Sequence, residues 1–119
     1  MYHAQELGKG GEDLACKYLE ENNYQILERN FSCSQGEIDI IAKDKLKQEI
    51  VFFEVKTRSN TKYGSPANSV NTKKQKHIKK AIKYYAYKNN LKNIPIRIDV
   101  IEIYTKREDY NINQIQQII

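Results

Sequence analysis

The chain has 119 residues, 20 Lys and Arg against 15 Asp and Glu, a net charge of +5 and 39% apolar residues. This length suits one domain, residues 1–119, and no apolar run approaches the ~18 residues that a membrane-spanning helix needs. The first residues make no signal-peptide pattern, so we expect a cytoplasmic protein without membrane contact. Cys16 and Cys33 are too few for a zinc site or a disulfide framework, and we expect both to be reduced packing residues.

Positive charge is concentrated in one part of the chain. Between Val55 and Ile98 there is no Asp or Glu but there are twelve Lys and Arg, so the rest of the chain is acidic. This asymmetry indicates a basic face directed at a polyanion, and nucleic acid is the expected partner. Compositional drift toward Lys, Asn and Ile is the alternative, although drift alone does not remove acids.

The first predicted element is a helix over residues 6–22, with apolar positions at spacings of three, four and seven. Its firm part begins near Gly11, because three glycines weaken the preceding residues. Glu12 lies one turn from Ala15 on the buried stripe, where a carboxylate would reach a site on the sheet. A surface glutamate favoured by the helix dipole is the alternative.

Strands are predicted next. Residues 24–30 form a first strand, and the short link over residues 31–35 favours an antiparallel neighbour. Residues 37–42 and 50–56 are rich in Ile, Val and Phe and flank a polar turn over residues 43–49, which indicates a β-hairpin.

One face of this hairpin is charged. Alternation along the strands places Glu37, Asp39, Ile41, Phe52, Glu54 and Lys56 on one face, and Ile38, Ile40, Ala42, Val51, Phe53 and Val55 on the other. The second face is apolar and is explained as core. Asp39, Glu54 and Lys56 need another explanation, because an unpaired charge inside a central strand is expensive.

Two carboxylates that converge on one point make the oxygen-rich site that Mg²⁺ or Mn²⁺ prefers, with Asp39 and Glu54 as the ligands. Lys56 would lie beside the metal and position or deprotonate a water. This combination suits hydrolysis of a phosphodiester, in which the metal offsets developing charge. A buried ion network without substrate is the structural alternative, although such networks contribute little stability.

The second half of the chain supplies the basic surface. Residues 57–66 read as a loop beside the site, and residues 72–89 predict a helix with one apolar stripe and lysines opposite. The predicted nucleic-acid contacts are Arg58, Lys73, Lys74, Gln75, Lys76, Lys79, Lys80 and Lys83. A bound phosphate would offset the repulsion between lysines and the positive end of this helix.

The last predicted strand covers residues 96–104, in which Asp99 is expected to make a structural ion pair. The isoleucines of residues 112–119 are spaced as on one face of a short helix, and this spacing leaves the tail open between helix and strand.

These residues also carry a resemblance. Asp39 followed by Glu54-Val55-Lys56 resembles the PD-(D/E)xK signature of restriction-endonuclease-like nucleases, with Ile38 in place of the proline. Residues 36–42 (GEIDIIA) and 53–58 (FEVKTR) resemble the YraN family, small bacterial proteins of unproven function that are expected to be nucleases related to archaeal Holliday-junction resolvases. Residues 11–15 (GEDLA) resemble the opening motif of that family.

The resemblance implies a third acid at Glu12 and a final strand at the tail. It also implies the fold that the element order predicts, an α/β domain with a restriction-endonuclease-like mixed β-sheet flanked by α-helices. The resulting hypothesis is a Mg²⁺-dependent nuclease of branched or flapped DNA in repair or recombination. A non-catalytic nucleic-acid-binding module with the same fold is the alternative, and a homodimer through the basic helix or a sheet edge is compatible with the sequence.

Overall fold

The computed structural model describes residues 2–3, 10–58, 72–106 and 109–116. In chain order the elements are β1 (Tyr2–His3), α1 (Gly11–Glu21), β2 (Tyr24–Cys33), β3 (Gly36–Asp44), β4 (Glu49–Arg58), α2 (Thr72–Lys88), β5 (Ile96–Lys106) and β6 (Asp109–Ile115). None of the helices in these ranges is long and apolar enough to cross a membrane.

The described strands form one mixed sheet in the order β1-β6-β5-β4-β3-β2. The pair β4 and β5 is parallel, because α2 lies between them in the chain and returns it to the same end of the sheet. The other neighbours are antiparallel, including the β3–β4 hairpin. This mixed sheet with helices on it confirms the predicted α/β fold.

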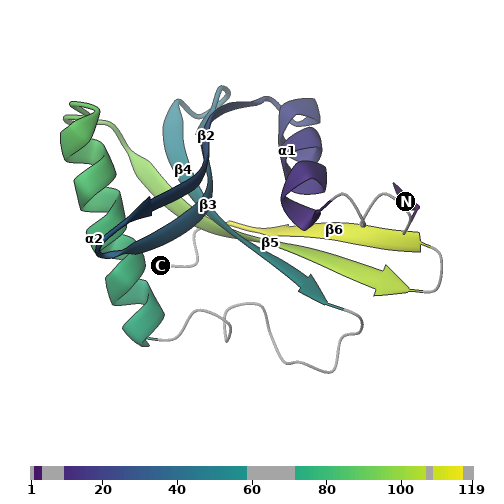
Figure 1. Cartoon of the computed structure of the whole chain (residues 1–119). Helices are drawn as coiled ribbons and strands as arrows, with labels where there is room; N and C mark the ends of the chain where they lie inside the picture. The colour runs from purple at the N-terminus through teal and green to yellow at the C-terminus, as the bar shows by residue number, and fades with distance from the viewer. Residues whose placement is uncertain (1, 4–9, 59–71, 107–108, 117–119) are drawn as a thin grey trace.

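The two helices cover opposite faces of the twisted sheet (Figure 1). On one face, Leu14, Ala15 and Leu19 of α1 pack in a core with Ile40 and Phe53. The separate cores follow from strand alternation, which sends neighbouring apolar residues to opposite sides.

On the other face, Ile78 and Tyr85 of α2 pack in a core with Phe31, Ile41 and Phe52. The Tyr85 ring lies edge-on to Phe31 and Phe52, with centroids 5.2 and 5.8 Å away. This aromatic contact fixes α2 over β2, β3 and β4, and thereby sets where its lysines lie.

A buried arginine ties the turn end of the hairpin to β5. Arg97 is 3% exposed and donates to Asp99 at 2.9 Å, to Asp44 at 3.0 Å and to Glu49 at 2.8 Å. Tyr24 accepts from the same guanidinium at 2.5 Å. The predicted structural ion pair of Asp99 is thereby confirmed. The network holds β3, β4 and β5 together near the hairpin turn.

Several predicted boundaries change. The first strand runs to Cys33 rather than residue 30, and the predicted loop begins later, because Thr57 and Arg58 belong to β4. Residues 6–9 of the predicted first helix and residues 59–66 of the loop lie outside the described residues.

The helical spacing of the tail was misleading, since residues 109–115 form β6. In this strand Ile112 packs against the α1 core and Ile115 against the α2 core. A spacing of three therefore reaches opposite faces of the sheet, and the strand implied by the family resemblance is correct.

Candidate metal and nucleic-acid site

The site begins where β3 separates from β4. The paired register of the hairpin ends at Ile40 and Phe53, one residue short of Asp39. The Oδ2 atom of Asp39 accepts a hydrogen bond from the backbone N–H of Val55 at 2.7 Å, so a side chain takes the place of a strand-to-strand bond.

This separation corrects one predicted face. Ile38 packs with the α2 core and Ile40 with the α1 core, so the two do not share a face as predicted. The alternation rule assumes a regular strand, and β3 is irregular at the intervening residue, Asp39. The remaining apolar residues of the predicted core face, Ala42, Val51, Phe53 and Val55, do pack together on the α1 side.

Asp39 is half-buried beside a hollow of about 250 Å³ that is also lined by Asn30, Ser32 and Glu37. Burial raises the pKa of Asp39 from 3.8 to about 6; the Val55 N–H opposes this shift, and the carboxylates of Glu54 and Glu12 add to it. The charges of Glu54 and Glu12 therefore act on Asp39, which borders a space large enough for water and a ligand.

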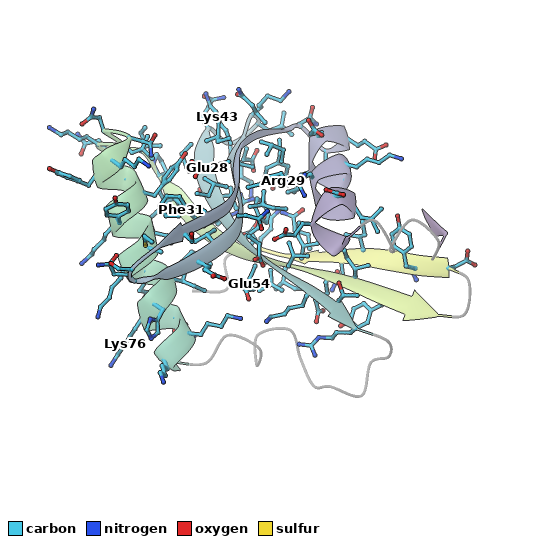
Figure 2. All side chains as sticks on the ribbon, in the orientation of Figure 1. Glu28, Arg29, Phe31, Lys43, Glu54 and Lys76 are labelled. Carbon is cyan, nitrogen blue, oxygen red and sulfur yellow. The ribbon has the colours of Figure 1, made fainter. Side chains whose placement is uncertain are left out.

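Glu54 is largely enclosed, with a side chain 11% exposed. Its Oε1 atom accepts from Lys56 Nζ at 3.2 Å and also from Lys74 Nζ, which reaches down from the first turn of α2. Figure 2 shows Glu54 in the space between β3 and the amino-terminal half of α2. The three residues of the predicted acid, acid and lysine set are thus brought together.

Glu12 joins the site from the opposite helix. In the amide orientation that satisfies hydrogen bonding, Asn30 donates to both carboxylate oxygens of Glu12, at 2.8 and 2.9 Å. Gly11 lets the start of α1 approach the sheet, because a Cβ atom there would lie 2.7 Å from Thr57 Oγ1. Glu12 is therefore held beside Asp39 rather than directed at solvent.

A second polar group, missed from the sequence, lies next along the same face. In the parallel register Lys56 is paired with Glu102, and Arg58 with Tyr104. Glu102 is fully buried and accepts from Arg58 Nε at 3.0 Å and from the Tyr104 hydroxyl at 2.6 Å. A buried carboxylate thus fixes the predicted phosphate contact Arg58 beside Lys56.

The predicted lysine contacts do not all lie together. Lys73, Lys76, Lys79, Lys80 and Lys83 are exposed along α2, and Gln75 is half-buried. Lys79 and Lys83 line a different hollow of about 290 Å³ with Ile82, Ile96 and Ile98. Lys74 differs from these lysines, because it contacts Glu54.

The donor set fits a hard cation that keeps water ligands. No three His, Cys, Asp or Glu side chains within the described ranges stand close enough to form a complete protein cage. Mg²⁺ does not need one, because it is bound through one or two carboxylates with several waters retained. Asp39 beside the hollow and Glu54, which already holds two ammonium groups, match this requirement.

The fold and the charged set together define the class. The structure is an α/β protein with a restriction-endonuclease-like arrangement of sheet and helices, and its acids and lysine lie where two strands separate.

The family follows from comparison with other proteins. The model of uncharacterised protein family UPF0102 matches residues 11–103, and the chain belongs to this family, which confirms the resemblance to YraN. A UPF0102 protein of Clostridioides difficile is 50% identical over 106 residues, 89% of this chain and 91% of that one. A UPF0102 protein of Caldicellulosiruptor saccharolyticus is 43% identical over 113 residues, 93% and 94% of the two chains. A third, of Carboxydothermus hydrogenoformans, is 41% identical over 114 residues, 96% and 95% of the two chains.

Proposed function

We propose that this protein is a nuclease that uses Mg²⁺ or Mn²⁺ to hydrolyse phosphodiester bonds of DNA. The observation that carries the proposal is the convergence of Asp39, Glu54 and Lys56 where β3 leaves β4, with Asp39 bordering a hollow of about 250 Å³. Stability alone does not explain this set, because burial and the nearby carboxylates of Glu54 and Glu12 raise the pKa of Asp39.

Each residue has a distinct role in the proposal. Asp39 and Glu54 would hold the metal, which supplies a Lewis acid and a more acidic water. Lys56 would position the attacking water and place positive charge near the phosphate. Glu12 would act as an outer acid that accepts a hydrogen bond from a metal-bound water.

Binding of the DNA backbone would fall to Arg58 and to the exposed lysines of α2. Contacts of this kind go to phosphates and carry no sequence information, so the substrate would be selected by its shape. A branched or flapped DNA, a role in repair or recombination, a cytoplasmic location and a homodimer all remain parts of the proposal. The preference for branched DNA rests on the family resemblance alone.

One observation favours a second candidate, a nucleic-acid-binding module without catalysis. Lys56 and Lys74 already neutralise Glu54, so this acid has cationic partners without any metal. Such a module would bind DNA equally well with metal and with chelator.

The test is a cleavage assay on labelled linear, single-stranded, flapped and four-way DNA with Mg²⁺, with Mn²⁺ and with chelator. Asp39→Asn and Lys56→Ala remove the proposed metal ligand and the catalytic lysine, and Lys45→Ala is the matched control in the exposed hairpin turn. The nuclease predicts metal-dependent cleavage that both site variants lose and the control keeps. Metal-independent binding without cleavage by any variant would support the module instead.

A further inference from the structure

Two ammonium groups share one oxygen atom of the site. Lys56 and Lys74 both donate to Oε1 of Glu54, from β4 and from the first turn of α2. The Glu54 side chain is 11% exposed and that of Lys74 33% exposed, so the pair is partly shielded from solvent.

The charges explain why both lysines are held there. Without a metal, two neighbouring acids need two positive charges, and Lys56 and Lys74 supply them. A divalent cation between Asp39 and Glu54 would add two further positive charges beside the two ammonium groups. The cation and the ammonium group of Lys74 would then repel each other, and the partial burial of the site leaves this repulsion incompletely screened. Lys74 and the metal are therefore alternatives at Glu54.

We propose that Lys74 stands in for the metal at Glu54 in the metal-free protein and turns to a phosphate of the nucleic acid when the metal binds. This inference rests on the proposed function and deepens it, since it gives Lys74 a role that the other lysines of α2 do not share. The long side chain of lysine makes the change possible without movement of the helix. A phosphate is also the better partner at the start of a helix, where the dipole opposes a free lysine and favours an anion.

Lys76 provides a matched control. It is an exposed lysine two residues further along the same helix, and it projects from the side of α2 away from Glu54 (Figure 2). Lys74→Met and Lys76→Met change the net charge equally, but only the first removes the contact with Glu54. Lys74→Arg keeps the charge and serves as the conservative variant.

The experiment measures two affinities by separate methods. Calorimetry gives the affinity of the chelator-treated proteins for Mn²⁺ without DNA, with Glu54→Gln as the variant that lacks the metal ligand. Fluorescence anisotropy gives the affinity for a labelled flapped DNA in Ca²⁺. Circular dichroism and the urea midpoint confirm that each variant is folded.

The proposal predicts effects of opposite sign for Lys74→Met. Its affinity for Mn²⁺ rises about tenfold above wild type, because the competing charge is gone, and its affinity for DNA in Ca²⁺ falls about fivefold further than that of Lys76→Met. Lys74→Arg stays within about twofold of wild type in the Mn²⁺ titration. A lysine that only stabilises the fold would lower both affinities or neither.

The outcomes separate this inference from the proposed function. If Mn²⁺ binds wild type but not Glu54→Gln, and Lys74→Met binds no tighter than Lys76→Met, the metal site stands and the role of Lys74 is wrong. If Mn²⁺ binds none of the proteins, the metal site and the inference both fail.

Discussion

Replacement of Asp39 by Asn should make the metal-free protein more stable at pH 8 while it removes the proposed nuclease activity. The folded state holds the proton of Asp39 more tightly than the unfolded chain, with a pKa of about 6 against 3.8. The ionised carboxylate therefore costs folding free energy above pH 6, and this cost disappears below about pH 4. Asparagine has no charge to ionise, and its amide oxygen can still accept from the Val55 N–H.

The magnitude follows from the shift. Two pKa units correspond to about 3 kcal/mol, which is a ceiling for a carboxylate in the interior. Asp39 is only half-buried and borders a hollow of about 250 Å³, so we expect a gain of about 1–2 kcal/mol at pH 8. At pH 4.5 most of Asp39 is protonated in the folded state, and the gain should fall to less than half of that value.

Urea unfolding in the presence of chelator, at pH 8 and at pH 4.5, measures both quantities. Asp44→Asn is the control of opposite sign, because hydrogen bonds from Lys47, Arg97 and Leu46 outweigh burial and lower the pKa of Asp44. This control should lose stability at pH 8. The reasoning is refuted if Asp39→Asn is less stable than wild type at pH 8, or if its gain is equal at both pH values.

Three further predictions concern the support of the site. Gly11→Ala places a Cβ atom 2.7 Å from Thr57 Oγ1, so it should lower the free energy of unfolding in urea by about 1–3 kcal/mol and reduce cleavage by displacing α1. Stability and cleavage equal to wild type would show that the close approach is unimportant. Glu102→Gln breaks the buried ion pair with Arg58 and should lower the free energy of unfolding by about 3–5 kcal/mol. DNA affinity should also fall, because Arg58 is no longer fixed, and unchanged stability would contradict this role of Glu102. Lys80→Ala should reduce the dependence of DNA affinity on salt by about one unit of slope in a titration series, and an unchanged slope would place the DNA elsewhere.

Much of the site could be predicted because it depends on local pattern. Two apolar runs around a polar turn indicate a hairpin, and alternation then places Glu54 and Lys56 on one face. The structure keeps both, with the two side chains 3.2 Å apart. The buried face of α2 was also predicted from its apolar spacing. The residues of this stripe that are buried in the structure are Ile78, Ala81, Ile82 and Tyr85.

The remainder depends on contacts between distant parts of the chain. Glu102 becomes informative only when β5 is known to lie parallel to β4 with Glu102 opposite Lys56. Asn30 is a candidate only when β2 is known to bring it beside Glu12. Neither register is encoded in a short motif, because strand order is set by the packing of the whole sheet.

The irregularity at Asp39 had no local signal either. The run from Ile38 to Ala42 is apolar enough for a regular strand, and the departure is visible only in the structure, where the hairpin register ends at Ile40 and Asp39 accepts from the Val55 N–H. Lys74 was predicted as a phosphate contact along with the other lysines of α2. Helical periodicity does not distinguish it, because its contact with Glu54 depends on where the first turn of α2 lies over the sheet.

The most direct test of the central claim is cleavage of a labelled flapped or four-way DNA as Mn²⁺ is titrated, with wild type, Glu54→Gln and Lys45→Ala compared side by side. The account predicts that wild type and Lys45→Ala cut the DNA only when Mn²⁺ is present, and that Glu54→Gln neither binds the metal nor cuts. Cleavage by Glu54→Gln at the wild-type rate, or cleavage by wild type in chelator, would contradict it.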